Sequence, residues 1–132
     1  NHNRRDRMAV NGPDQSMFDN TSMMLSKLME MSMERQRVIS SNIANVNTPG
    51  YKRRVLSFES EFARLVKEQD QASLEKMRGF VEEDTKSPGR EDGNNVQLPN
   101  ETNDLMQNGM YHRLLNRALK LKMSILKAAI TK

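Results

Sequence analysis

The chain has 132 residues, which allows one domain, and it is polar: 36% of its residues are hydrophobic, 5% are aromatic, and its mean hydropathy is −0.81. It carries 21 Lys and Arg against 17 Asp and Glu, and it has no cysteine, which excludes disulfides and thiolate sites. No apolar run approaches the roughly 20 residues of a membrane span, and no signal-peptide core is recognisable. We expect two ordered segments and much disorder in the isolated monomer.

The first part of the chain predicts an arm followed by a helix. Residues 1–20 are polar and contain a turn signal at Gly12-Pro13-Asp14, so they predict a flexible N-terminal arm. Apolar residues then recur at three- and four-residue steps and predict an amphipathic helix over residues 21–47, which Thr21 or Ser22 would cap. Its apolar stripe includes Leu25, Leu28, Val38 and Ile39.

Three asparagines and a Pro-Gly turn mark the end of that helix. Asn47 suits a left-handed C-cap, and Pro49 cannot continue the helix. Pro49-Gly50 fits the two central positions of a type II turn, so the chain should leave the helix in one defined direction. Asn42 and Asn45 are expected to make polar contacts in the packing there. The expected turn residues are Asn42, Ile43, Ala44, Asn45, Asn47, Thr48, Pro49, Gly50 and Tyr51.

The signals are weaker in the central region, residues 48–100. Residues 57–78 hold enough apolar side chains for one moderate helix, which Gly79 would end. Residues 82–95 are charged and contain proline and glycine, so they predict a mobile loop. Residues 96–98 predict a very short extended piece.

A second long amphipathic helix is predicted over residues 101–132, with Asn100 as its N-cap. Its apolar stripe is wider than the two-in-seven seam of a dimeric coiled coil. The two long helices can pair as an antiparallel hairpin, but a pair leaves the flanks of both stripes in water, which indicates packing with helices of other subunits. The expected assembly residues are Leu25, Leu28, Val38, Ile39, Tyr111, Leu114, Leu115, Ala118, Ile125, Leu126 and Ala129.

The predicted fold class is therefore all-α. Long N- and C-terminal amphipathic helices pair as a hairpin or coiled coil, and a short, partly disordered central region joins them.

No residue pattern predicts catalysis or metal binding. His112 has no acidic residue three or four positions away, so it lacks metal-ligand spacing. The acidic run Glu82-Glu83-Asp84 lacks the alternating ligands of a calcium loop, and the isolated glycines form no phosphate-binding loop. We expect no enzyme, no cofactor and no small-molecule substrate.

The main alternative is a basic helical adapter that binds nucleic acid or an anionic membrane surface. Residues 51–54 place a tyrosine beside three cations, which could stack on a base and contact phosphates. Against this, the predicted helices also carry acidic residues such as Glu30 and Glu34, and no DNA- or RNA-binding signature is recognisable. We favour a tyrosine that anchors the turn and cations that are solvated.

Residues 39–53 (ISSNIANVNTPGYKR) resemble the signature of the bacterial flagellar axial proteins, which form the rod, the hook and the hook-associated parts. Ser41 occupies a position that is often Asn in that signature. The small size and the phrase at residues 92–96 (DGNNV) resemble the proximal rod members, although the acidic residue usual after the valine is missing. The matching residues are Asn42, Ile43, Ala44, Asn45, Thr48, Gly50 and Tyr51.

The resemblance implies a structural subunit of the proximal rod of the flagellar basal body. Such a subunit polymerises through its terminal helices into the helical drive shaft that transmits torque. The implied partners are other rod proteins, the rod-adapter protein, the MS ring and, transiently, the flagellar type III export apparatus, with no nucleic acid. The implied location is the periplasmic rod, reached without a cleaved signal peptide, with ordering coupled to assembly.

Overall fold

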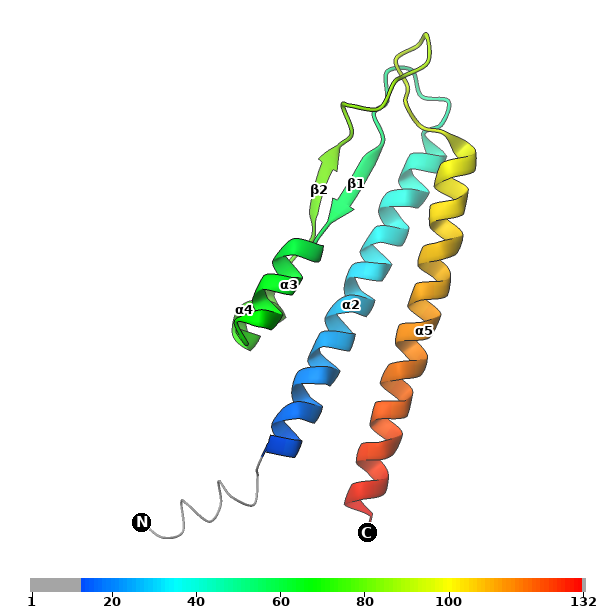
Figure 1. Ribbon diagram of the computed structural model, residues 1–132. Helices are drawn as coiled ribbons and strands as arrows, with labels where there is room; N and C mark the ends of the chain where they lie inside the picture. Colours follow the sequence, from blue (N-terminus) through cyan, green and yellow to red (C-terminus); the bar gives the residue numbers. More distant parts are fainter. Residues whose placement is uncertain (1–12, 132) are drawn as a thin grey trace.

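A computed structural model describes residues 13–131, and their side chains from Asn20 onward. Two long helices, α2 (Pro13–Ala44) and α5 (Leu98–Ile130), run antiparallel and lie side by side, as Figure 1 shows. The described ends of the chain lie at the same end of this hairpin, and the loops that join the long helices to the middle of the chain lie at the other. Within the described residues, no helix is long and apolar enough to cross a membrane. The first 12 residues of the expected arm lie outside the described residues.

Both long helices begin earlier than the sequence predicted. α2 starts at Pro13, so Pro13 and Asp14 of the expected turn lie in the first helical turn, and residues 13–20 of the expected arm are helical. α5 starts at Leu98 with a proline in its first turn, and Gln97 rather than Asn100 precedes it. The physical reason is the same at both starts, because the N–H that proline lacks has no partner in the first turn of a helix.

The all-α prediction is correct for the long helices but misses a small sheet. β1 (Arg54–Ser57) and β2 (Phe80–Glu83) pair antiparallel, with Arg54 opposite Glu83 and Ser57 opposite Phe80. Each strand has four residues, and only Leu56 of β1 is buried, so neither strand shows an alternation that a sequence reading can detect.

The single central helix that the sequence predicted is two short helices instead. α3 (Glu59–Lys67) and α4 (Gln71–Lys76) are separated by Gln69, whose φ is +55°. The side chain of Asp70 accepts a hydrogen bond from the backbone N–H of Ser73 at 3.1 Å and so starts a new helix. Aspartate favours such caps over helix interiors because its short carboxylate bonds to nearby backbone N–H groups.

The hydrophobic core lies between α2 and the middle of the chain. Burying each large apolar side chain there contributes about 1.5–3 kcal/mol. Half-buried Leu28 and Val38 of α2 pack against this core, while α5 packs on another side of α2. The wide stripe of α2 is therefore partly covered within the chain, which the sequence did not predict. The buried core residues are Met31, Leu56, Phe58, Leu65, Leu74 and Met77.

Candidate functional site

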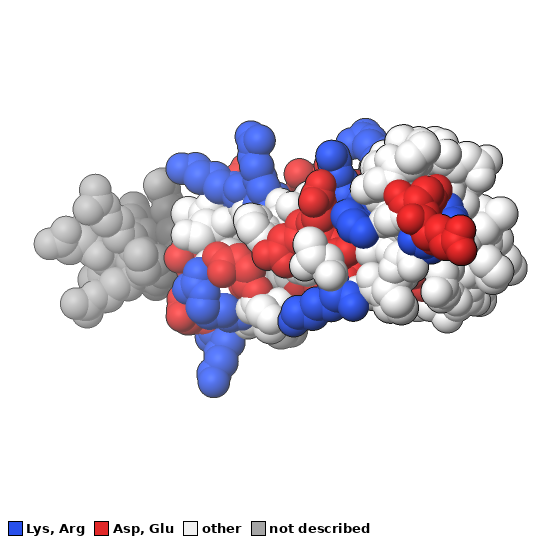
Figure 2. Space-filling view, turned by 90° about the horizontal axis from the view of Figure 1, so that it is seen from above, with Lys and Arg blue, Asp and Glu red and all other residues white. Residues whose placement is uncertain are grey.

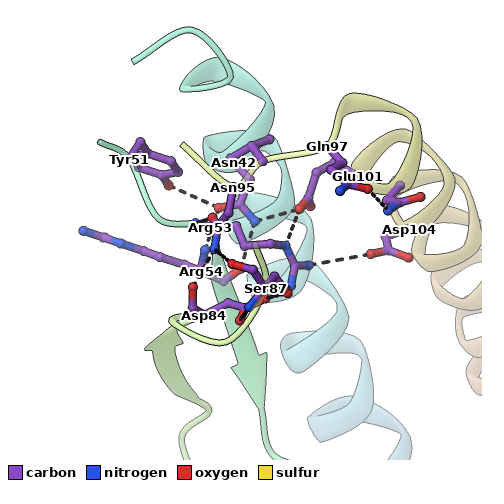
Figure 3. Close-up of polar contacts among 12 residues, drawn as sticks. Asn42, Tyr51, Arg53, Arg54, Asp84, Ser87, Asn95, Gln97, Glu101 and Asp104 are labelled. Carbon is purple, nitrogen blue, oxygen red and sulfur yellow. Dashed lines mark hydrogen bonds and ion pairs between the residues drawn. The ribbon is translucent and has the colours of Figure 1, made fainter. Parts of the chain in front are cut away.

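The predicted turn forms a polar cluster at the end of the hairpin that is opposite the described ends of the chain, which we call the closed end (Figure 3). Asn42 lies in the last turn of α2 and is 0% exposed. Its Nδ2 donates to the carbonyl oxygen of Arg54 at 2.8 Å, and its Oδ1 accepts the N–H of Arg54 at 2.8 Å. The hydroxyl of Tyr51 donates to the same Oδ1 at 3.1 Å. The side chain of Asn42 thus bonds to both the backbone N–H and the backbone carbonyl of Arg54, the first residue of β1. These two bonds fix the strand on α2.

Arg53 is the centre of a second set of contacts, which contradicts its expected role as a solvated cation. Its Nε donates to Glu101 Oε1 at 2.6 Å, and its Nη1 donates to Asp84 Oδ2 at 3.1 Å (Figure 3). Glu101 is 0% exposed and also accepts a hydrogen bond from Asn42 Nδ2 at 3.3 Å. A buried carboxylate is tolerated only when it is paired and hydrogen-bonded, and these contacts meet that requirement.

The charges of this cluster stabilise one another. Burial opposes the charge of Arg53, but the hydrogen bonds that it donates to Glu101 and Asp84 outweigh burial and raise the pKa of the guanidinium. The hydroxyl and the backbone N–H of Ser87 donate to the carboxylate of Asp84, and these bonds, together with Arg53, hold the pKa of Asp84 well below its usual range. Both groups therefore stay ionised at neutral pH.

Asn94 holds the turn that follows α2. It is fully buried, and its Nδ2 lies 2.9 Å, 3.1 Å and 2.8 Å from three carbonyl oxygens of that turn. Two of these carbonyls also accept backbone N–H groups within the turn, so this one amide ties an already folded turn to a distant segment. The left-handed C-cap expected at Asn47 is wrong. Such a cap needs a positive φ, and among the described non-glycine residues only Gln69 has one. The three carbonyls belong to Asn45, Val46 and Thr48.

The segment predicted to be a mobile loop is tied to the rest of the molecule. Asn95 is buried, its Oδ1 accepts the N–H of Arg53 at 2.7 Å, and its Nδ2 donates to the carbonyl of Asp84 at 2.6 Å. Gly50 donates its N–H to the carbonyl of Asp92 at 2.8 Å. The segment has no long regular element, and it is held by bonds that no local sequence pattern reveals.

The type II turn has the geometry that its sequence predicts. Gly50 has a φ of +74°, and the N–H of Tyr51 donates to the carbonyl of Thr48 at 3.2 Å. A positive φ at this position strains any residue with a Cβ, which explains the glycine. Asn45 lies just before the turn and accepts the hydroxyl of Thr48 at 3.0 Å. Of the other turn residues, Ile43 is half-buried, and Ala44, Asn47 and Pro49 are exposed.

The expected assembly residues divide into two groups in the structure. Leu115 and Ile39 are buried within the monomer, at 5% and 6% exposure. Leu114 and Ile125 are exposed by 64% and 47%, and Tyr111 by 38%. Leu25, Leu28, Val38, Ala118 and Leu126 are half-buried, and Ala129 is exposed.

Sequence reasoning missed two exposed apolar residues of α5, Met106 and Met110, but counted Leu121 in the wide stripe. Met106, Met110 and Leu121 are exposed by 65%, 61% and 63%, and they lie at four- and seven-residue steps from Leu114 and Ile125. These five residues therefore share one face of α5, which we call the outer stripe. The buried residues of α5, at positions 101, 108 and 115, lie on a different face. The sequence alone had no signal for which face of α5 meets α2.

The polar groups that the structure brings together make structural contacts with one another. No group of three His, Cys, Asp or Glu residues that could hold a metal occurs in the part of the chain that the structure describes. On the face seen in Figure 2, Lys and Arg are interspersed with Asp and Glu and do not form one basic patch. Interspersed charges do not favour the electrostatic footprint of a nucleic-acid-binding protein.

Comparison with known proteins gives a consistent result. The family described as "Flagella basal body rod protein" matches residues 33–52, which include the last turns of α2 and the Pro-Gly turn.

Three relatives all carry the name "Flagellar basal body rod protein FlgB". The one from Borrelia hermsii is 31% identical over 117 residues, which are 75% of this chain and 87% of the relative. The one from Borreliella burgdorferi is 37% identical over 101 residues, 62% of this chain and 75% of the relative. The one from Bacillus subtilis is 27% identical over 130 residues, 88% of this chain and 97% of the relative.

Proposed function

The chain belongs to the FlgB family of flagellar basal body rod proteins, and from this premise we propose that it joins the rod through the outer stripe of α5. It is a structural subunit of the basal-body rod, assembles with other rod proteins and is not an enzyme. What the sequence left open is the surface through which subunits meet. The outer stripe is the single observation that supports our choice of surface.

The exposure of the outer stripe argues for a partner. Its members are Met106, Met110, Leu114, Leu121 and Ile125. A row of large exposed apolar side chains along one helix face is costly for a monomer in water and is typical of an interaction surface. Two of these five residues are methionines, whose flexible, unbranched side chains suit packing against a helix of a neighbouring subunit. The buried Leu115 and Ile39, by contrast, contribute by holding α5 on α2 within each subunit.

We further place the subunit in the proximal, periplasmic rod. There its neighbours are the rod-adapter protein, the MS ring and other rod proteins, and it reaches them through the flagellar type III export apparatus. The resemblance of residues 39–53 and 92–96 to the proximal rod proteins supports this placement. In such a shaft, torque passes from subunit to subunit through side-by-side helix contacts, and the polar cluster keeps each helical hairpin from opening.

The test uses Met110→Asp in cells that lack their own copy of this protein. We expect the variant to be absent from isolated basal bodies and the cells to be non-motile, because a carboxylate on the outer stripe cannot be buried without a partner. Ala72→Asp is the matched control, since Ala72 is exposed in the first turn of α4, far from the stripe. Normal incorporation of Met110→Asp would exclude the outer stripe as the assembly surface.

No observation in the described residues favours the nucleic-acid or membrane-surface alternative. Arg53, one of the three cations after Tyr51, is held by Glu101 and Asp84, so it cannot contact phosphates without breaking the cluster.

A further inference from the structure

A groove with a cavity of about 450 Å³ lies between α2 and α5 and is lined by no residue of the sheet. Its wall on α2 includes Ser32, Met33 and Arg37, and its wall on α5 includes Gly109 and His112. A Cβ added at Gly109 would meet no atom within 4 Å, so this wall is open. We call this site the donor groove.

Two buried polar atoms of the donor groove lack a hydrogen-bond partner. They are the Oγ of Ser32, a residue that is 2% exposed, and the Nδ1 of His112. Their neighbour Asn108 is fully engaged on its amide nitrogen, which donates to the carbonyl of Ser32 at 2.8 Å and to Gln36 Oε1 at 2.9 Å. Buried polar atoms in native proteins are paired almost without exception. Two unpaired atoms in one groove therefore indicate that another molecule supplies their hydrogen-bond partner.

The side chains around the groove define the chemistry of that partner. Ser32, Gln36, Arg37, Ser40 and His112 carry groups that can donate hydrogen bonds, whereas the amide nitrogen of Asn108 is already used, and no acidic residue lines the groove. Arg37 uses Nη1 to pair with Glu34 at 3.0 Å on the exposed side, and its other N–H groups stay available to a partner. Donors without a negative charge among them are complementary to a carboxylate. The exposed Met33 at the edge adds an apolar contact.

One segment of the same chain carries the matching groups. In β2, the exposed Phe80 and Val81 are followed by Glu82 and Glu83. Both carboxylates are exposed and make no hydrogen bond or ion pair with other described residues. β2 also has one edge that is not paired in the two-stranded sheet. Side chains alternate along a strand, so Val81 and Glu83 share one face, and this apolar side chain beside a free carboxylate is the complement of Met33 beside the donors.

We propose that the donor groove binds the Glu82–Glu83 end of β2 from a second copy of this chain. The proposal rests on the proposed function, which places copies of the chain together in the rod. Because the groove and β2 are different surfaces, the contact is heterologous, and heterologous contacts that do not close produce helical assemblies. The carboxylate of Glu83 pairs with Arg37 and reaches the unpaired groups of Ser32 and His112, while Val81, on the same face of β2, covers Met33.

The first experiment is cysteine crosslinking. The sequence has no native cysteine, so only the introduced cysteines can form disulfides. A chain with Gly109→Cys and Glu83→Cys should form disulfide-linked dimers and higher multimers under mild oxidation in isolated basal bodies. The matched control carries Gly109→Cys with Glu91→Cys, another exposed carboxylate position, and should stay monomeric. Equal crosslinking in test and control, or none in an incorporated test chain, overturns the proposal.

The second experiment is a charge exchange, which keeps the proposal testable if a cysteine variant is not incorporated. Arg37→Glu and Glu83→Arg should each lower incorporation into basal bodies about tenfold, and the double variant should recover most of it, because both charges are exposed and the swap restores attraction. Wild-type incorporation by either single variant, or no recovery in the double variant, overturns the proposal. The proposed function has its own readouts, because it is tested by the incorporation of the wild-type chain and of Met110→Asp into basal bodies and not by the groove variants.

Discussion

At the scale of single residues, two buried polar side chains hold the closed end of the hairpin. Asn42 uses its amide nitrogen and its amide oxygen, and Glu101 uses both carboxylate oxygens, so neither is left without partners. In a region of low dielectric such contacts are strong when complete and costly when one member is removed. The cluster therefore specifies one arrangement of α2, β1 and α5.

Replacing Asn42 by alanine should destabilise the isolated chain by about 2–4 kcal/mol, because the backbone of Arg54 and the Tyr51 hydroxyl lose their buried partner. Urea denaturation followed by circular dichroism measures the free energy of unfolding. Asn47→Ala is the control, since Asn47 is exposed and should change that free energy by less than about 0.5 kcal/mol. Similar values for the two variants would show that the cluster does not stabilise the fold.

The depressed pKa of Asp84 predicts a loss of stability in acid. The folded-state pKa of Asp84 lies below its unfolded-state value, mainly because of Ser87, so its contribution is complete above the unfolded pKa and decreases as the pH falls. Stability should decline below about pH 4, and Asp84→Asn should be less stable than wild type at pH 7 but lose less on acidification. Denaturation curves between neutral and acid pH measure the difference. Parallel pH profiles for the two proteins would exclude Asp84 as a contributor.

At the scale of the elements, α5 carries two faces with different tasks. Its buried residues, Glu101, Asn108 and Leu115, recur every seven residues and form the seam against α2. Two of the three are polar and bond to specific partners, which fixes the register of α5 along α2 at some cost in apolar burial. The outer stripe lies on another face and is left for neighbours.

Neighbouring leucines separate these tasks experimentally. Leu115→Asp should unfold or strongly destabilise the isolated chain, by about 3 kcal/mol or more, because it places a charge in the seam. Leu114→Asp should leave stability within about 0.5 kcal/mol, since Leu114 is 64% exposed, and should still block incorporation into rods. Thermal melts and basal-body isolation give the two readouts. A stable Leu115→Asp chain, or an incorporated Leu114→Asp chain, would contradict this division of α5.

At the scale of the whole molecule, packing is uneven along the hairpin. The closed end has the polar cluster, and the core residues lie between α2 and the middle of the chain. No residue of α5 after Leu115 is buried within the described range. The free energy of local opening should therefore fall along α5 toward its end.

Hydrogen exchange of the isolated chain should report this gradient. Amides near Asn42 and Leu56 should exchange slowest, and those of residues 119–130 should exchange fastest and gain protection in assembled rods. Exchange measured by mass spectrometry on the free chain and on basal bodies tests both statements. Equal protection along all of α5 in the free chain would show that α5 needs no neighbour to be ordered.

Local chemistry explains what the sequence by itself determined. Helical periodicity gave the two long helices, proline and glycine gave the turn at Gly50, and the asparagine motif indicated the flagellar family. Each of these depends on residues within a few positions of one another, so each is visible in one stretch of sequence.

Tertiary structure alone decided which groups meet across the chain. The pairing of β1 with β2, the burial of Arg53 against Glu101, and the bonds from Asn94 to the turn after α2 all join segments that are far apart in sequence. The same holds for the face of α5 that stays exposed, since Leu114 and Leu115 are alike in sequence and opposite in burial. Such outcomes depend on how elements pack, and packing is a property of the folded chain that no local pattern contains.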